Sequence, residues 1–151
     1  MRHVLLSDGP RKTFALIFEK GDEVMRETTA FARREHLTAA HLTAIGAFRD
    51  AVLGYFDPAR RDYRRIPVRE QVEVLTLAGD VAVKDGQPQV HAHVVLGLSD
   101  GSTRGGHLLE AHVWPTPLEL ILVESPAELR RRSDPETGLA LIDPGASRPG
   151  A

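Results

Sequence analysis

The sequence has no cysteine, few aromatic residues and no long apolar run. Without cysteine, the chain of 151 residues cannot perform thiolate catalysis or hold an iron–sulfur cluster or a cysteine-type zinc site. No segment approaches the roughly 20 apolar residues that span a bilayer. The first residues reach a charge and a Gly-Pro turn too soon for a signal peptide. We therefore expect a cytoplasmic protein without a membrane segment.

An excess of charge of one sign is also missing. The chain has 19 Lys and Arg residues against 21 Asp and Glu residues, so its formal net charge is −2. This balance argues against a protein that coats nucleic acid through overall positive charge, but it leaves a local basic patch open. The length and the 42% of hydrophobic residues fit one globular domain. We expect that domain to cover residues 1–143, and we expect the Pro- and Gly-rich residues 144–151 to form a disordered tail.

Turn signals divide the sequence into many short strands and one helix. Apolar residues recur at steps of three and four between Asp22 and His36, which predicts a helix there with Asp22 as its cap. The main strands that we predict from apolar and β-branched runs are 13–18, 40–47, 51–56, 72–77, 90–98 and 118–124. Because hairpin-type turns dominate, we expect an α+β fold with a mostly antiparallel, strongly twisted, barrel-like sheet and one or two helices.

The clearest site signal is a pair of histidines on one predicted strand. His91 and His93 are two residues apart, so their side chains point to one face of the sheet. Every second residue from Val90 to Leu98 is apolar and forms the opposite face, which must be core. The two Cβ atoms are then about 7 Å apart. This spacing suits two imidazoles that converge on one metal ion, although a solvated polar face is the alternative for such a pair.

A third histidine follows the next turn. The segment 99–101 (Ser-Asp-Gly) is typical of a hairpin, and a returning strand would bring His107 beside the first two histidines. Gly105-Gly106 lets the backbone approach closely there. Three neutral imidazoles without a fourth protein ligand are typical of an open zinc site, whose metal holds water and acts as a Lewis acid. The roles of His41 and His112 stay open at this point.

One carboxylate lies within an apolar strand and is our candidate catalytic residue. Glu73 shares its predicted face with Leu75 and Leu77. It is therefore either a buried general base, a buried partner of the metal ligands, or a charge exposed at an edge. A metal-polarised carbonyl reaction such as decarboxylation or hydrolysis would suit this set of residues. No residue in the sequence indicates which of these reactions would take place.

Arginines gather between two predicted strands. Arg60, Arg61, Arg64 and Arg65 surround Tyr63, and basic residues with an interleaved aromatic ring are a candidate nucleic-acid contact. A solvated loop is the alternative, because charge runs usually lie on the surface.

Four segments of the sequence resemble the PPC domain (plants and prokaryotes conserved) in its stand-alone bacterial and archaeal form. They occur in the order of the family, together cover about residues 13–142, and are 45–56, 72–79, 91–93 and 105–110. The Gly-Gly-His-Leu segment that follows the His-x-His strand is the most specific of the four.

The resemblance implies an α+β domain that assembles as a homotrimer. It also implies a metal ion, commonly zinc, on three histidines, and these match His91, His93 and His107. The fold is similar to that of α-acetolactate decarboxylase, a three-histidine metal enzyme. One implied function is therefore a small-molecule site near the subunit boundaries, and a metal that only stiffens the sheet is the alternative.

Family convention would call such a chain a DNA-binding regulatory protein. In plants the domain follows an AT-hook, and this sequence has no Arg-Gly-Arg-Pro segment. The plant motif Gly-Arg-Phe-Glu-Ile-Leu is replaced by Glu-Gln-Val-Glu-Val-Leu at residues 70–75. Both departures argue against a transfer of the plant nuclear function, so the arginines between residues 60 and 65 are the main local support for DNA as a partner.

Overall fold

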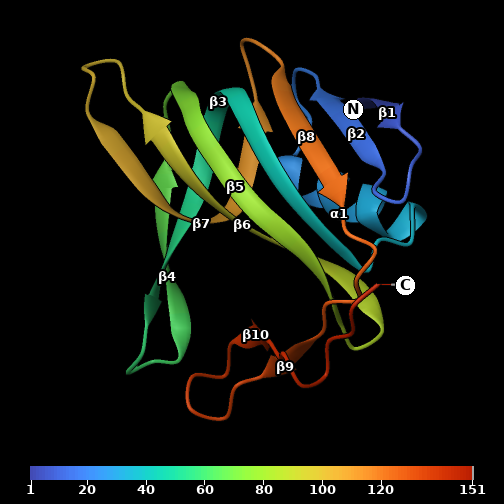
Figure 1. The fold of residues 1–151 in the computed structure, drawn as a ribbon. Helices are drawn as coiled ribbons and strands as arrows, with labels where there is room; N and C mark the ends of the chain where they lie inside the picture. The colour runs from blue at the N-terminus through green and yellow to red at the C-terminus, as the bar shows by residue number, and fades with distance from the viewer. Residues whose placement is uncertain (151) are drawn as a thin grey trace.

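The computed structural model describes residues 1–150 as a strongly twisted antiparallel sheet with one helix against it (Figure 1). This arrangement confirms the predicted α+β class. In chain order the elements are β1 (Arg2–Ser7), β2 (Thr13–Phe18), α1 (Val24–Arg34), β3 (Ala39–Asp57), β4 (Asp62–Val68), β5 (Val72–Lys84), β6 (Gln87–Gly97), β7 (Thr103–Val113), β8 (Leu118–Glu124), β9 (Arg131–Ser133) and β10 (Ala140–Ile142).

The main sheet has the strand order β1-β2-β8-β3-β5-β6-β7, and β4 pairs with β3. Strand β7 also pairs with β3, so that β3, β5, β6 and β7 close into a small ring. The sequence predicts separate strands at 40–47 and 51–56, but β3 is one strand of 19 residues. Its first half pairs with β8 and its second half with β4 and β7. This change of neighbours part-way along one strand gives the sheet its twist and closure.

Glycine allows β3 to bend at the predicted place. Gly46 lies at a register irregularity between β3 and β5, as its position in the apolar run indicates. Its φ is +150°, and a Cβ there would collide with the backbone of Pro117 and Leu118. The position therefore requires glycine both for its conformation and for the close approach of β8.

The helix begins one residue later than its predicted cap implies. The Glu23 carboxylate accepts hydrogen bonds from the backbone N–H groups of Met25 and Arg26, at 3.1 Å and 2.6 Å. The prediction that Asp22 is the cap is wrong, because the Asp22 carboxylate closes the preceding turn by accepting from the backbone N–H of Glu19. The longer side chain of Glu23 reaches the free N–H groups of the first helical turn instead. Within residues 1–150, no helix has the length and apolar character needed to cross a bilayer.

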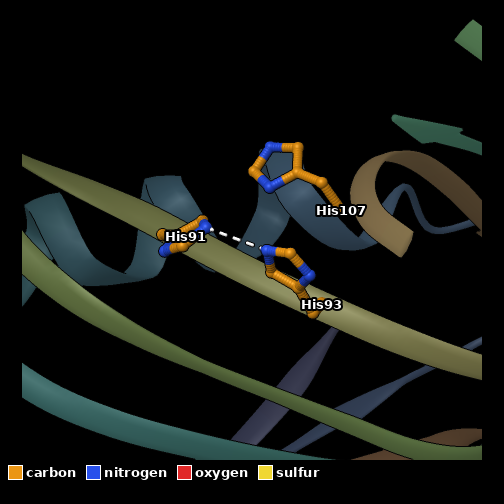
Figure 2. Close-up of side chains that lie close together, drawn as sticks. All are labelled: His91, His93 and His107. Carbon is orange, nitrogen blue, oxygen red and sulfur yellow. Dashed lines mark hydrogen bonds between the residues drawn. The ribbon is translucent and has the colours of Figure 1, made fainter. Parts of the chain in front are cut away.

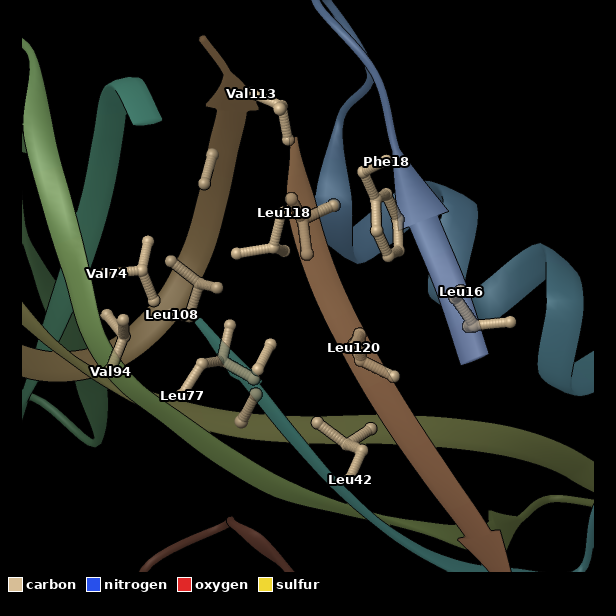
Figure 3. Packing of buried hydrophobic residues seen from close by; sticks show 14 of the residues in the cluster. Leu16, Phe18, Leu42, Val74, Leu77, Val94, Leu108, Val113, Leu118 and Leu120 are labelled. Atoms are coloured by element: carbon tan, nitrogen blue, oxygen red, sulfur yellow. The ribbon is translucent and has the colours of Figure 1, made fainter. Parts of the chain in front are cut away.

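The core fills the space between the concave face of the sheet and α1 (Figure 3). Phe31 of α1 is fully buried and contacts the ring of Phe14 edge-on, with ring centroids 5.0 Å apart. On β6 the residues Ala92, Val94 and Leu96 are at most 2% exposed, so the predicted apolar face of the histidine strand is confirmed. This packing turns the alternate residues of β6, the histidines, toward the other face.

After β8 the chain leaves the main sheet and forms the separate two-stranded hairpin of β9 and β10 (Figure 1). The segment before β9 lies along the end of β5, where the backbone N–H of Val83 donates to the carbonyl of Leu129 at 2.7 Å. For residues 144–150, for which the sequence predicts a disordered tail, the structure has a turn after Asp143 and a bridge between Glu128 and Arg148. The C-terminal segment, residues 131–141, lies on the same side of the sheet as the histidines of β6, because Arg131 and residues 139–141 border the same hollow as those histidines.

Candidate metal centre

Three histidines from two neighbouring strands meet on one face of the sheet (Figure 2). His91 and His93 project from β6, and His107 lies on β7 directly opposite His93 in the strand register. The three ring centroids are 5.1 to 5.3 Å apart. The return of the chain after the turn at 99–101 therefore brings the third histidine to the first two, as the sequence predicts.

The ring nitrogens are spaced as a metal ion requires. One nitrogen from each histidine lies within 4.8 Å of the others, and the Nε2 atoms of His91 and His93 are 3.2 Å apart. Two nitrogens bound to one ion at about 2.1 Å and a tetrahedral angle are roughly 3.4 Å apart. The Nδ1 atom of His107 is buried and has no hydrogen-bond partner. A buried nitrogen without a partner is costly, and a cation would satisfy it, so the donor set fits a divalent metal.

The surroundings keep two of these imidazoles neutral. Burial, followed by the charges of His91, His93 and Arg131, lowers the pKa of His107 from its ordinary value to about 4. Burial and the neighbouring His91 also lower the pKa of His93. A neutral imidazole has a free lone pair, so the site favours the state of the ring that binds metal.

A carboxylate and a guanidinium support the cluster from behind. Asp80 lies opposite His91 in the register of β5 and β6, with its Oδ2 atom 3.6 Å from the Nδ1 atom of His91. Its other oxygen pairs with Arg131, whose side chain is 5% exposed and also donates to the carbonyl of Ala140 at 2.9 Å. Burial alone would raise the pKa of Asp80, but the contact with His91 and the charge of Arg131 lower it below its ordinary value. Asp80 is therefore held as a carboxylate behind His91.

The sequence does not single out Asp80 or Arg131. The run Ala78-Gly79-Asp80 looks like the turn that ends a strand, but β5 continues through it to Lys84. Gly79 instead allows β5 and β6 to lie close together, because a Cβ there would collide with the carbonyl of His91. The apolar run Val81-Ala82-Val83, which is buried throughout, is the signal that could have extended the strand.

A cavity of about 380 Å³ adjoins the histidines. Its lining comes from β4, β6, β7 and the C-terminal segment, and consists of Tyr63, Gln89, Val90, His91, His93, His107, Arg131, Leu139, Ala140 and Leu141. The ring of Tyr63 stacks on His107 with a centroid distance of 4.6 Å and an interplanar angle of 19°. This volume is at the small end of the roughly 300–1,000 Å³ typical of ligand pockets.

The candidate catalytic residue lies outside this cavity. Glu73 is exposed on β5, so the alternatives that place it in a buried site do not apply. The structure also places His41 and His112 outside the cluster. His41 is exposed on β3, and the Nδ1 atom of His112 is 2.7 Å from the Asp50 carboxylate. The cluster of described residues that could hold a metal therefore contains His91, His93 and His107 alone.

The arginines of the predicted basic patch are exposed on the hairpin of β3 and β4. Arg61 donates to the backbone carbonyls of Pro135, at 2.8 Å, and Glu136. Two others also have neighbours within the chain: Arg65 lies 3.5 Å from the Glu110 carboxylate, and Arg64 lies over the ring of Tyr55. Arg60 is in the turn of this hairpin. The surface position is the one expected of a charge run, and part of its charge is used to hold the hairpin in place.

Solved structures of several prokaryotic proteins are similar to this chain. A metal-containing protein from Archaeoglobus fulgidus is 36% identical, with a TM-score of 0.77 over 87% of this chain and 92% of that protein. A plant- and prokaryote-conserved protein from Pyrococcus horikoshii is 31% identical, with a TM-score of 0.81 over 94% of each chain. A protein from Ralstonia eutropha JMP134, described as a "Putative DNA-binding protein", is 29% identical, with a TM-score of 0.81 over 86% of this chain and 90% of that one.

The sequence is also similar to part of longer proteins. The bifunctional protein GlmU of Synechococcus sp. strain JA-3-3Ab is 33% identical over 136 residues, which are 88% of this chain and 20% of that protein. The chain thus spans about a fifth of the length of the curated relatives it matches. The Plants and Prokaryotes Conserved (PCC) domain matches residues 6–126, which include the whole of the histidine strands β6 and β7. The chain therefore belongs to the Plants and Prokaryotes Conserved (PCC) domain family.

Proposed function

We propose that this protein binds a divalent metal ion, best zinc, through His91, His93 and His107, and that the ion serves a small molecule bound in the adjacent cavity. The observation that carries the proposal is the position of three imidazole nitrogens, within 4.8 Å of one another, in the lining of a cavity of about 380 Å³. Neutral nitrogen donors suit zinc. The metal-containing relative from Archaeoglobus fulgidus supports the same reading.

The surrounding residues would each have a separate task in such a site. The three histidines leave room for a further ligand, so a bound ion would supply Lewis-acid chemistry to a molecule in the cavity. Tyr63 covers one face of the His107 ring and keeps water from it. Asp80 orients His91, and Arg131 keeps Asp80 ionised.

Metal analysis of the purified protein tests this proposal. We expect about one zinc ion per chain in the wild type, loss of the ion in His91→Ala, and retention in His41→Ala, which removes an exposed histidine outside the cluster. If the metal-free His91→Ala variant keeps its thermal stability, the ion serves a function other than folding. Collapse of its fold would assign the ion a structural role. A wild type that takes up no metal contradicts both.

We also propose that the protein is a homotrimer, as the family resemblance implies. The outward face of the sheet supports self-association, because Ile45, Leu75 and Ile121 are 60%, 52% and 39% exposed on the strands β3, β5 and β8. Size-exclusion chromatography with light scattering would give about three times the mass of one chain. A monomer at micromolar concentration contradicts this assembly.

A second candidate function is DNA binding, which the exposed Arg60, Arg64 and neighbouring arginines favour together with the Ralstonia relative. Binding would be electrostatic and would weaken steeply with salt. We expect retention on a duplex of random sequence at low salt and its loss when Arg60 and Arg64 are replaced by alanine. Absence of retention at low salt contradicts this candidate and leaves the metal proposal unaffected.

A further inference from the structure

We propose that the C-terminal segment 131–141 makes the cavity a binding site for a small ligand with a metal-binding head and an uncharged, apolar body. The inference rests on the metal site proposed above and names the class of molecule that the site takes. Neither the family match, which ends at residue 126, nor the similar structures assign a role to this segment.

The cavity lining consists of two chemically different parts. One part is the set of three histidines, whose nitrogens face a common point. The other part is carbon-rich: the ring of Tyr63, and Leu139, Ala140 and Leu141 from the C-terminal segment. Leu141 is 48% exposed, so its apolar surface remains in contact with water unless a ligand covers it. A ligand held at the histidines by a polar head would lay an apolar body against these side chains.

The charge of the lining limits the ligand further. Within residues 1–150, Arg131 is the one Lys or Arg side chain that lines this cavity. Its two terminal nitrogens already pair with Asp80 and with the carbonyl of Ala140, and its Nε atom is buried. Phosphate groups beyond the metal-binding head would therefore find no free cation, so nucleotides and sugar phosphates do not suit the cavity. A monoanionic head such as a carboxylate or hydroxamate needs the metal alone.

The C-terminal segment is held over the site by defined contacts. Ile142 of β10 pairs with Arg131 of β9, and the Arg131 side chain reaches Asp80 on β5. On the far side, Arg61 of the β3–β4 hairpin donates to the carbonyls of Pro135 and Glu136. The apolar residues of the cavity are thus fixed relative to the histidines, as a binding site requires.

Titration of the zinc-loaded protein with two hydroxamates tests the inference. Acetohydroxamic and hexanohydroxamic acid share one metal-binding head and differ by four CH₂ groups. Each buried CH₂ strengthens binding about fourfold, so burial of two of the four predicts about fifteenfold tighter binding of the longer probe. We expect Leu141→Asn to remove most of this preference without changing the zinc content or the affinity for acetohydroxamic acid. Leu141→Met should retain it.

Leu5→Asn is the matched control, because Leu5 is 43% exposed on β1 and lies outside both the cavity and the apolar face of the proposed trimer. It should bind both probes as the wild type does. Equal affinity of the two probes in the wild type, or an undiminished preference in Leu141→Asn, overturns the inference while the metal site stands. A wild type that takes up no zinc overturns the proposed function and this inference with it.

Discussion

Replacement of Asp80 by asparagine tests whether the Asp80 carboxylate strengthens metal binding by His91. The change removes the negative charge that lies 3.6 Å from the Nδ1 atom of His91 and pairs with Arg131, but it keeps the shape of the side chain. Carboxylates behind metal-bound histidines typically contribute 10- to 100-fold to metal affinity. We therefore expect Asp80→Asn to weaken zinc binding by about 1.4–2.7 kcal/mol.

The same substitution also has a cost in the metal-free protein. The Arg131 side chain is 5% exposed, so its charge would lose its compensating partner in a largely buried position. Breaking a fully buried pair costs about 3–5 kcal/mol. The Asp80 side chain is 30% exposed, and asparagine keeps an oxygen that can accept from Arg131, so we expect a smaller loss of about 1–3 kcal/mol.

Competition against a chromophoric chelator at pH 7.5 would measure the zinc affinity, and urea denaturation with and without zinc would measure the stability. Asp100→Asn is the control, since it removes one negative charge from the exposed turn between β6 and β7, where Asp100 accepts from Ser102. It should leave zinc affinity unchanged. If Asp80→Asn loses stability but binds zinc as tightly as the wild type, then Asp80 is a structural partner of Arg131 and does not orient His91.

Three further outcomes are expected. The folded pKa of His107 is about 4, below the unfolded value of about 6.5, so the unfolded chain takes up the proton first. The stability of the metal-free protein should therefore fall as the pH decreases from about 6.5 toward about 4. Urea denaturation across this range should show a weaker dependence of stability on pH for His107→Gln than for the wild type. The same dependence in both would contradict the assignment to His107. Tyr63→Ala exposes the His107 ring on which Tyr63 stacks, so zinc should transfer to a chelator faster, whereas Tyr63→Phe should behave as the wild type in the same stopped-flow assay. Gly46→Ala should lower the free energy of unfolding by about 1–3 kcal/mol or more, because a Cβ collides with Pro117 and the φ of +150° disfavours alanine. Gly9→Ala, where there is room for a Cβ, should change it little. Equal denaturation midpoints for Gly46→Ala and the wild type would contradict the argument.

The histidine cluster can be predicted from local patterns in the sequence. The alternation along 90–98 determines which face His91 and His93 share, because a strand has a period of two and the other face is buried. The turn at 99–101 then determines the direction of the return, so His107 follows without any knowledge of the rest of the fold. The geometry of the histidine cluster is predictable because it depends on one hairpin.

The position of Glu73 shows where the same reasoning fails. A regular strand would put Glu73 on the face of Leu77, but the register of β5 against β6 shifts between Val74 and Thr76. Past this irregularity Leu77 is 1% exposed, whereas Leu75 is 52% exposed. One additional residue in a strand reverses the faces on its two sides, and nothing in the run of apolar letters marks it.

Local sequence patterns also do not predict the pair of Asp80 and Arg131 behind His91 or the cavity beside the histidines. Asp80 and Arg131 are 51 residues apart in the sequence, and Arg61 and Pro135 are 74 apart. These pairs depend on how the C-terminal segment docks on the sheet. A short polar stretch between Pro and Gly residues contains no periodic signal for such docking.

The hairpin of β9 and β10 has a consequence for how chains of this kind diversify. The three imidazoles lie on strands of the main sheet, whereas Leu139 and Leu141 beside them belong to a separate hairpin. Substitutions at these two leucines would leave the histidines in place and would alter only the apolar surface next to them. The part of the proposed site that selects a ligand can therefore vary independently of the histidine cluster.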